Sequence, residues 1–330
     1  MKIAMIVCWE GNLPDYFKLW EYSCSKNAEY DFLIFTDHPE KSQYKNIKFI
    51  NFSLGDFNNV ASKKLKMNIN VKRPYKLCDF RPAYGIIFED YLKKYDFWGH
   101  CDIDQIFGNI KKFITNEMLK KYDKINKNGH FVLYKNTYKM NTLFTMDGGL
   151  FNYIEVFNSD ENYAFDEYTG INMIVKKQNV NCIYINDFAD IDKGSKRYIC
   201  KNHQNYRYQF YEYDNGRVLK VYYDNGLKNQ EMMYLHFQKK KLKINNIRFE
   251  KSIAIGYKKC CNIEKNNNFT KEMIKSINGS KNDFMDFFEK IYYYIRKVKE
   301  FFLSSRERKK IWLKQKKSLE EYKWKKNMVF

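Results

Sequence analysis

Three apolar runs separated by a helical pattern, all within residues 2–52, constrain the fold most. The runs KIAMIV, DFLIFTD and NIKFINF occupy residues 2–7, 31–37 and 46–52. Between the first two, residues 14–27 place polar and apolar side chains at helical spacing. Continuous apolar runs of this length are typical of strands that are buried on both faces of a parallel sheet. The order strand, helix, strand, strand therefore predicts a Rossmann-like, nucleotide-binding half of an α/β protein.

The alternation continues through the middle of the chain. AYGIIFEDYLKK at 83–94 predicts a helix, YDFWGHCDID at 95–104 a strand, residues 110–122 a helix and HFVLYK at 130–135 a strand. A length of 330 residues, of which 44% are apolar, is enough to fill the core of one large α/β domain with an appendage.

The residue pattern then changes to one that is typical of a β-meander. In residues 211–237 the tripeptide Asp-Asn-Gly occurs at 214–216 and again at 224–226, with alternating residues between. Such turns predict two hairpins that join three strands, the third of which delivers His236. A polar stretch around 262–270 reads as a linker, and beyond it apolar residues recur at helical spacing. These residues are Phe284, Phe288, Ile291, Ile295, Val298 and Phe302.

We therefore expect a main domain over residues 1–245, a linker or peripheral segment over 246–280, and a basic amphipathic helical tail over 281–330. The excess of 59 Lys and Arg over 39 Asp and Glu gives a net charge of +20, which indicates an anionic partner. Half of this excess lies in residues 290–330, where fourteen basic residues face four glutamates. Aromatic residues mixed with this charge favour a helix on an anionic membrane surface. The alternative is that the apolar stripe packs on the main domain or on a second subunit.

Cysteine usage and the first residues bear on the compartment. The eight cysteines are scattered without CxxC pairs, which is typical of reduced thiols in a cytosol. MKIAMIVCWEG has no small-residue cleavage site and reads as a first strand rather than a signal peptide. No run approaches the roughly 18 apolar residues of a membrane span. The sequence therefore predicts a cytoplasmic protein, peripheral at the inner face of a bacterial plasma membrane.

Two carboxylates stand one residue apart, directly after the aromatic run YDFW. Asp102 and Asp104 follow the predicted strand, and residues two apart on a strand point to the same side. Paired oxygen ligands suit a hard divalent cation such as Mn²⁺ or Mg²⁺, with phosphates and waters completing the shell. The Asp-x-Asp pattern alone is common by chance, so its context decides its weight.

That context resembles a known family. The pattern PYKLCD, then PAYG, then YDFWGHCDID over residues 74–104 resembles a bacterial family of polysaccharide-biosynthesis glycosyltransferase-like proteins with the GT-A fold. The resemblance runs from the first strand through GHFVLYKNT, FDEYTG and YLHFQKKKL, and excludes the C-terminal tail. It implies a GT-A mixed sheet and the transfer of a sugar from a nucleotide diphosphate, with a UDP-sugar expected as the donor.

The resemblance also implies residues that contact the nucleotide sugar. Thr36 and Asp37, after the second strand, would contact the base or ribose. Lys76, Asp79 and Arg81 would flank the donor, with a basic side chain offered to phosphate and Asp79 accepting from sugar or base. The alternative for these three residues is an ion-pair cluster on the surface.

His236 lies where metal-dependent GT-A enzymes carry a C-terminal histidine, and imidazole suits Mn²⁺ as a third protein ligand. In the retaining galactosyltransferases the motif is His-x-x-Gly-x-Lys, and its lysine reaches the diphosphate. This chain has His-Phe-Gln-Lys-Lys-Lys without the glycine, and Lys239 is the lysine that we assign to the diphosphate. A packed strand histidine is the alternative for His236.

Acceptor activation needs a carboxylate on the far face of the sugar if the reaction inverts, whereas retention can use the leaving phosphate. Asp166 and Glu167 in AFDEYTG, and Asp147 beside two glycines, are the candidates. Each of them could instead be a helix cap or a turn residue.

The sequence as a whole predicts a metal-dependent glycosyltransferase that acts on a growing cell-surface glycan, in capsule, O-antigen or lipid-linked form. Two alternatives remain: a nucleic-acid-binding protein, suggested by the charge and the aromatic residues, and a scaffold with this fold but without turnover. No recognised nucleic-acid-binding motif occurs, and the intact Asp102 and Asp104 disfavour the scaffold. An oligomer is compatible with all three.

Overall fold

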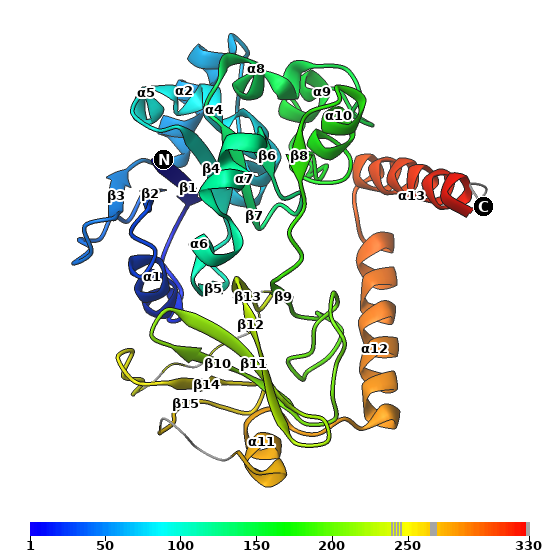
Figure 1. Ribbon diagram of the computed structural model, residues 1–330. Helices are drawn as coiled ribbons and strands as arrows, with labels where there is room; N and C mark the ends of the chain where they lie inside the picture. Colours follow the sequence, from blue (N-terminus) through cyan, green and yellow to red (C-terminus); the bar gives the residue numbers. More distant parts are fainter. Residues whose placement is uncertain (239, 241, 243, 245, 265–268, 328–330) are drawn as a thin grey trace.

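The computed structural model describes residues 1–238, 240, 242, 244, 246–264 and 269–327, and the side chains of 283–285 and 321–327 lie outside this description. Among the described residues the largest sheet has seven strands in the order β3-β2-β1-β4-β7-β6-β8, in the upper lobe of Figure 1. The bounds are β1 Ile3–Trp9, β2 Tyr30–Thr36, β3 Ile47–Asn51, β4 Phe97–Cys101, β6 Lys124–Ile125, β7 Phe131–Lys135 and β8 Cys182–Ile183.

The large sheet is mixed. β1 runs parallel to β2 and β4, and β2 runs parallel to β3, whereas β7 is antiparallel to its neighbours β4 and β6. This is the mixed, Rossmann-like arrangement expected of the GT-A class, and with the meander and helical extension described below it confirms the predicted fold class. Because β1, β2 and β4 are parallel, their carboxyl ends meet at one edge of the sheet, where ligands bind in open α/β folds.

Short helices cover both faces of this sheet (Figure 1). Their bounds are α1 Phe17–Ser25, α2 Leu54–Leu65, α3 Leu77–Phe80, α4 Tyr84–Ile87, α5 Glu89–Leu92, α6 Ile110–Phe113, α7 Asn116–Lys121, α8 Tyr138–Asn141, α9 Tyr153–Phe157 and α10 Ile171–Lys177.

The first strand shows why the sheet is buried on both sides. Successive strand residues point to opposite faces, and Ile6 packs in one core cluster with Phe57 of α2. Its neighbour Met5 packs in another cluster with Trp20 of α1. Each of these four side chains is at most 1% exposed. Burial on both faces is what the continuous apolar run of β1 predicts.

Two predicted helices are each divided in the structure. The helix expected over 83–94 consists of α4 and α5, which meet at Phe88, where φ of −105° and ψ of 19° leave the helical region. The helix expected over 110–122 consists of α6 and α7, because Thr115 caps the second by accepting a hydrogen bond from the Met118 amide. Apolar periodicity does not register such interruptions.

A small sheet lies against the edge where the parallel strands end. It contains β5 Gln105–Phe107, β13 Tyr234–His236 and β9 Ala189–Asp190, in the order β5-β13-β9. β13 is antiparallel to β5 and parallel to β9. This sheet joins the segment after Asp104 to two segments that are far away in sequence.

The meander forms a separate antiparallel sheet in the lower lobe of Figure 1. Both predicted hairpins are present, with Asn215 and Gly216 in one turn and Asn225 and Gly226 in the other, all at positive φ. The boundary expected at residue 245 falls between strands of this one sheet. The strands are β10 Gln209–Asp214, β11 Arg217–Tyr223, β12 Leu227–Met232, β14 Ile253–Ile255 and β15 Cys260–Asn262.

The expectation that the third meander strand delivers His236 is wrong. β12 ends at Met232, and His236 lies on β13, which belongs to the small sheet. The chain changes sheets at Met233, whose amide donates to the Asp187 carbonyl and whose carbonyl accepts from the Gly108 amide. Continuous alternation in the sequence hides this change of partner.

The C-terminal part is helical and comprises α11 Lys271–Asn278, α12 Asp283–Phe302 and α13 Arg306–Asn327. In Figure 1, α12 runs along one side of the molecule from the lower lobe towards the upper lobe, where α13 begins. Ile311 of α13 is buried in the main core, and the Gln315 side chain donates to the Tyr163 carbonyl at 2.9 Å. Among the described residues, no helix combines the length and the apolar character of a bilayer-crossing segment.

Candidate active site

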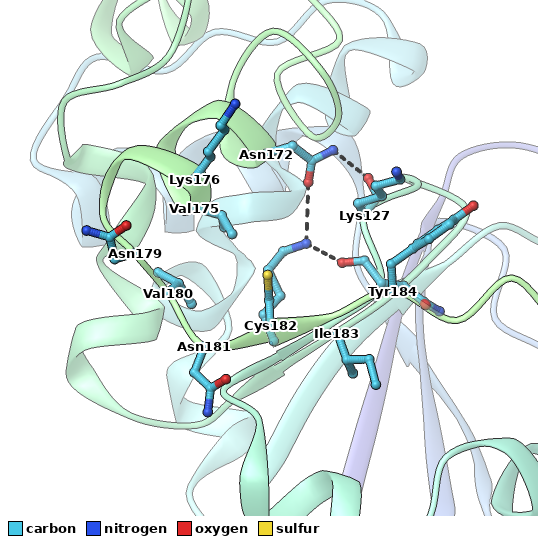
Figure 2. A pocket seen from close by; sticks show the side chains of 12 residues that line it. Lys127, Asn172, Val175, Lys176, Asn179, Val180, Asn181, Cys182, Ile183 and Tyr184 are labelled. Carbon is cyan, nitrogen blue, oxygen red and sulfur yellow. Dashed lines mark hydrogen bonds between the residues drawn. The ribbon is translucent and has the colours of Figure 1, made fainter. Parts of the chain in front are cut away.

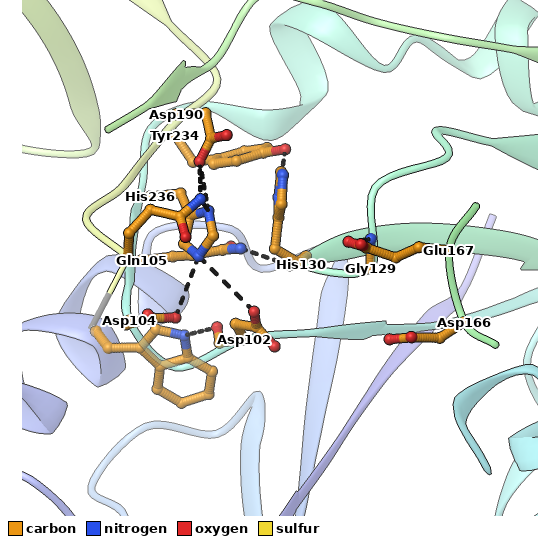
Figure 3. Close-up of polar contacts among 12 residues, drawn as sticks. Asp102, Asp104, Gln105, Gly129, His130, Asp166, Glu167, Asp190, Tyr234 and His236 are labelled. Carbon is orange, nitrogen blue, oxygen red and sulfur yellow. Dashed lines mark hydrogen bonds and ion pairs between the residues drawn. The ribbon is translucent and has the colours of Figure 1, made fainter. Parts of the chain in front are cut away.

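Asp102 and Asp104 lie in the turn that leads from β4 to β5, at the edge where the parallel strands end. The Asp102 amide donates to the His130 carbonyl at 3.0 Å, and the Trp20 indole donates to the Asp102 carbonyl at 3.2 Å. These bonds hold the backbone of the turn between α1 and the start of β7. Both carboxylates then reach the same neighbour, the imidazole of His236 (Figure 3).

The small sheet brings His236 to this turn. In its register His236 pairs with Gln105, and the Phe237 amide donates to the Asp104 carbonyl at 3.0 Å. As a result, His236 Nε2 lies 3.4 Å from Asp104 Oδ1 and 3.7 Å from Asp102 Oδ2. Residues 132 positions apart along the chain (236 − 104 = 132) are therefore neighbours in the fold.

Asp190 fixes the orientation of this imidazole. On β9, Asp190 pairs with His236 in register, and its Oδ1 lies 2.9 Å from His236 Nδ1. The Gln238 side chain also donates to Asp190 Oδ1. A carboxylate that accepts from one ring nitrogen leaves the other nitrogen as the free coordinating atom. The structure thus aims Nε2 of His236 towards Asp102 and Asp104.

His236 Nε2 is buried and has no hydrogen-bond partner within the described part of the chain. Burial alone would lower the pKa of His236, but the carboxylates of Asp104 and Asp190 outweigh it and raise the pKa to about 9. Buried polar atoms in folded proteins are almost always paired. This nitrogen instead forms longer ion pairs with Asp104 and Asp102, at 3.4 and 3.7 Å, where a cation could take the place of its proton.

A second histidine lies against the first. The rings of His130 and His236 are 4.4 Å apart, and the Tyr234 hydroxyl contacts His130 Nδ1 at 3.1 Å. Burial, with a smaller contribution from His236, lowers the pKa of His130 to about 3, so this ring is neutral. His130, Asp190 and His236 form a second trio of potential ligands that shares His236 with the first trio.

The donor set fits a divalent cation. One ligand atom from each of Asp102, Asp104 and His236 lies within 4.8 Å of the others. Two ligands at right angles on an Mg²⁺-like cation, each about 2.1 Å from it, lie about 3 Å apart. The observed separations of 3.4 and 3.7 Å are close to this value. Two carboxylates and one imidazole suit Mn²⁺ best.

Arg81 connects this trio to the acidic segment predicted on the acceptor side. Its guanidinium pairs with Asp102 Oδ1 and, at 3.1 Å, with Asp166 Oδ2. It also donates to the Gly129 carbonyl at 2.9 Å. Burial acts to raise the pKa of Asp102, but Arg81 and then His236 outweigh it and lower the pKa to about 2. Asp102 is therefore an anion that is stabilised by both Arg81 and His236.

Asp166 and Glu167 lie beside Gly129, which has no side chain. Glu167 Oε1 accepts from the Gly129 amide at 2.8 Å, and a Cβ at Gly129 would come within 2.7 Å of Asp166 Oδ2. Burial raises the pKa of Asp166 well above its usual range, although Arg81 acts against it. A carboxyl group with a raised pKa is suited to act as a general acid or base.

Lys76 and Asp79 form a closed, buried pair instead of facing an open site. Lys76 Nζ donates to Asp79 Oδ2 at 2.8 Å and to the Glu161 carbonyl. The two Asp79 oxygens also accept from the Tyr163 and Phe165 amides, each at 2.9 Å. The pair therefore fixes the backbone that leads into Asp166.

The described contacts of Thr36, Asp37 and Asp147 do not reach the trio. Thr36 ends β2 at the same sheet edge, and Asp37 accepts from the Gly11 amide at 2.7 Å. Asp147 is exposed, and the described contacts do not connect it to the trio. Lys239 lies outside the described residues.

The sequence alone did not indicate Asp190, His130 and Gln238 as residues of the site. Asp190 lies on a strand of only two residues, which has no periodicity to detect. His130 is the first residue of the strand predicted at 130–135 and carries no ligand spacing. The register of the small sheet brings Asp190 to His236, ring packing brings His130, and Gln238 follows His236 by two residues.

The fold and the site define a mixed α/β protein with an acid and histidine trio at the carboxyl edge of its sheet. The chain belongs to a family of unknown function, DUF6625, whose model matches residues 5–272. No curated protein matches the chain.

Among solved structures, the chain is similar to two glycosyltransferases. The apo-form glycosyltransferase GlyE of Streptococcus pneumoniae TIGR4 shares 13% identity at a TM-score of 0.34, over 55% of this chain and 45% of GlyE. The galactosyltransferase LgtC, in complex with donor and acceptor sugar analogs, shares 10% at a TM-score of 0.31, over 57% of this chain and 75% of LgtC. The chain thus spans less than half the length of GlyE. At these TM-scores the activity has to be argued from the site itself.

Proposed function

We propose that the protein is a metal-dependent glycosyltransferase that moves a sugar from a nucleotide diphosphate, with a UDP-sugar as the expected donor, to a cell-surface glycan. The observation that carries the proposal is the buried Nε2 of His236, which Asp190 aims between the carboxylates of Asp104 and Asp102, at 3.4 and 3.7 Å. These three residues would hold Mn²⁺ or Mg²⁺. A cation there, when bound, neutralises the negative charge that develops on the leaving diphosphate.

The chain's own residues would carry the other steps. Arg81 lies between Asp102 and Asp166, where it can hold an anionic group of the donor and the acceptor-side acid at the same time. Thr36 and Asp37, at the same sheet edge, are the residues proposed for the base or ribose. Lys76 and Asp79 would act by fixing the segment that bears Asp166, and Lys239 remains the proposed contact to the diphosphate.

The acceptor would enter on the side of Asp166 and Glu167. Asp166, whose pKa is raised by burial, can exchange a proton with an acceptor hydroxyl, and Glu167 is oriented by the hydrogen bond from the Gly129 amide. Asp147 remains a third candidate for this role.

A donor assay tests the proposal. Purified protein is incubated with a panel of nucleotide sugars and Mn²⁺, with and without EDTA, and the release of nucleoside diphosphate is measured. We expect slow, metal-dependent hydrolysis of one donor that Asp102→Asn abolishes. Hydrolysis at the same rate in EDTA would remove the metal from the proposal, and no hydrolysis of any donor would favour the scaffold.

Thermal unfolding provides a second measurement. A nucleoside diphosphate with Mn²⁺ should raise the melting temperature by mass action, and Arg81→Ala should weaken that shift. If nucleic acid gave the larger, salt-sensitive shift instead, the nucleic-acid-binding alternative would replace this proposal.

We further propose that α12 docks the enzyme on the anionic inner face of the plasma membrane. This helix turns its polar side to the protein: Asp286 pairs with Arg197 at 3.8 Å, and Glu289 accepts from the Lys196 amide at 2.8 Å. Eight of its described large apolar side chains are exposed, which is the reverse of an ordinary surface helix. They are Phe287, Phe288, Ile291, Tyr292, Tyr294, Ile295, Val298 and Phe302.

The charge next to this apolar face favours a lipid surface. α13 carries ten Lys or Arg against three Glu, and it follows α12 directly. Each basic residue near an anionic leaflet contributes about 1 kcal/mol, and aromatic rings prefer the headgroup level. A lipid-linked glycan acceptor would be presented at the same surface.

Vesicle co-sedimentation tests the docking. The triple variant Phe288→Ser, Ile295→Ser, Phe302→Ser should lose binding to vesicles that contain phosphatidylglycerol. The matched control changes three exposed apolar residues elsewhere, Tyr138, Ile154 and Leu227, to Ser and should still bind. If the wild-type protein did not bind vesicles but formed a dimer, and the triple variant did not form it, α12 would be a subunit interface instead.

A further inference from the structure

A cavity of about 580 Å³ lies between α10 and the strands β6 and β8, apart from the acid and histidine trio. Figure 2 shows the side chains that line it. Its volume is within the range of small-molecule sites. Seven of the twelve described residues that line it are Lys or Asn, and none of the twelve is acidic. They include Lys124, Lys127 and Lys176 together with Asn126, Asn172 and Asn181.

Lys124 is the unusual member of this lining. It is 1% exposed, and its Nζ bonds only to neutral oxygens: the Asn126 carbonyl and, at 3.4 Å, Asn172 Oδ1. The ring of Tyr134 lies 5.2 Å from Nζ. Within the described part of the chain, no carboxylate pairs with this amine. A buried cation without an anion is costly, and buried charges are normally paired.

Asn126 adds a second unsatisfied donor to the same lining. Its Nδ2 is buried and has no hydrogen-bond partner among the described residues, while its Oδ1 accepts from the Ile185 amide at 3.0 Å. Lys127 lies at the same cavity, with its Nζ 4.1 Å from the centre of the Tyr184 ring. A free amide N–H, a buried amine and a neighbouring lysine together present donors that an oxyanion would satisfy.

The cavity is joined to the acceptor side of the proposed active site by short backbone links. The Asn172 side chain donates to the Lys127 carbonyl at 2.6 Å, and the Asn172 amide donates to the Glu167 carbonyl at 3.2 Å. Two residues after Lys127, the Gly129 amide donates a hydrogen bond to Glu167. A ligand in the cavity would therefore lie beside the segment that holds Asp166 and Glu167.

We infer that this cavity binds an acidic sugar of the acceptor glycan, one that carries a carboxylate or a phosphate, through Lys124, Asn126 and Lys127. The inference rests on the proposed glycosyl transfer and names its acceptor class. The asparagines suit the hydroxyls of a sugar, and the lysines suit its negative charge.

Binding of simple acidic sugars to the full chain tests the inference. The probes are glucuronate and glucose 6-phosphate, with glucose as the neutral control, and dissociation constants are measured by calorimetry. We expect both acids to bind and glucose to bind at least tenfold more weakly. Equal binding of glucose, or inorganic phosphate binding as tightly as the sugars, would overturn the assignment to an acidic sugar.

Variants then locate the site. Lys124→Met removes the charge and should weaken the acids at least tenfold, whereas Lys220→Met is the matched control. Lys220 is also 1% exposed and also donates to a backbone carbonyl, that of Gln204, but it lies in the meander. If both variants bound the acids like wild type, the acids would not occupy this cavity, and the inference would fail.

Asn126→Asp is a second variant in case Lys124→Met does not fold. It keeps the oxygen that accepts from Ile185 and supplies an anion to the same lining, so it should abolish acid binding and preserve the fold. Undiminished acid binding would contradict the inference. Donor hydrolysis by the wild-type protein is recorded separately: hydrolysis without acid binding would reject this inference alone. The wild-type protein could also bind the acids, and the variants lose that binding, while no donor is hydrolysed. The cavity would then be an anion site, and its role as an acceptor site would be rejected.

Discussion

Two buried clusters of acid and base in this chain contrast in how they are satisfied. In the Lys76 and Asp79 pair, the lysine amine and both carboxylate oxygens have partners, three of which come from the backbone of Glu161, Tyr163 and Phe165. In the trio of Asp102, Asp104 and His236, the imidazole is oriented by Asp190 but its Nε2 is left without a hydrogen bond in the described structure. Both clusters are charged and buried.

The difference separates a structural cluster from a functional one. A network in which every atom is paired fixes a conformation and has no capacity for a ligand. A network in which one imidazole nitrogen is aimed between two carboxylates, no closer than 3.4 Å, can exchange its proton for a cation. Sequence motifs can suggest that a cluster is charged and buried. Charge and burial alone do not distinguish a structural cluster from a functional one.

The largest expected effect is on turnover at the open cluster. Asp104→Asn keeps the shape of the side chain but removes the charge that balances a cation, so we expect metal-dependent donor hydrolysis to fall about a thousandfold. Circular dichroism checks that the fold is kept. Wild-type turnover by this variant would mean that the trio is as structural as the Lys76 pair.

The corresponding change in the closed cluster should act on stability. Asp79→Asn leaves the Lys76 charge buried without its anion, and we expect the free energy of unfolding to fall by about 3–5 kcal/mol in urea denaturation. The exposed pair of Lys64 and Glu89 is the control, since Glu89→Gln should change stability by less than about 1 kcal/mol. Equal effects would remove the contrast between the two clusters.

A smaller effect is expected where Asp190 orients His236. Asp190→Asn replaces an acceptor with a group that can also donate, so the imidazole loses its fixed tautomer. We expect Mn²⁺ affinity to fall about 10–100-fold, measured by calorimetry. Lys201 also pairs with Asp190, at 3.4 Å, and Lys201→Gln should leave the affinity nearly unchanged. If the two variants behaved alike, the role of Asp190 would be one of charge and not of orientation.

A pH-dependent effect on stability is expected at the lysine of the cavity, a third case for the comparison. Burial lowers the pKa of Lys124 from 10.5 to about 7. Between these values the unfolded chain binds the proton that the folded chain has lost, so this group makes stability rise with pH, by up to about 1.4 kcal/mol per unit. Lys124→Met should flatten the rise between pH 7 and pH 10 in urea denaturation. An unchanged pH profile would show that Lys124 keeps its charge when buried.

The parts of the fold that could be predicted from the sequence are those with local signals. The apolar runs of β1, β2 and β3 and the Asn-Gly turns of the meander are each complete within a few residues. The pairing of β13 with β5 depends on a change of sheet at Met233, which no local pattern records.

The same limit applies to the candidate site. Asp102, Asp104 and His236 could be proposed from motifs and resemblance, and the structure brings the three together. Asp190 and His130 could not, because their roles come from register and ring packing between distant segments. The apolar stripe of α12 could be recognised in the sequence. The direction in which it faces could not, because it depends on Arg197 and Lys196, which bind the opposite side of the helix.

The most direct test of the account is to locate the cation in a crystal. Crystals grown with Mn²⁺ and a nucleoside diphosphate are measured at a wavelength where manganese scatters anomalously. The account predicts one strong anomalous peak about 2.0–2.5 Å from His236 Nε2 and from oxygens of Asp102 and Asp104. An anomalous map with no peak there, while nucleotide is bound and His236 Nε2 remains unliganded, would contradict the central claim that this trio is a metal site.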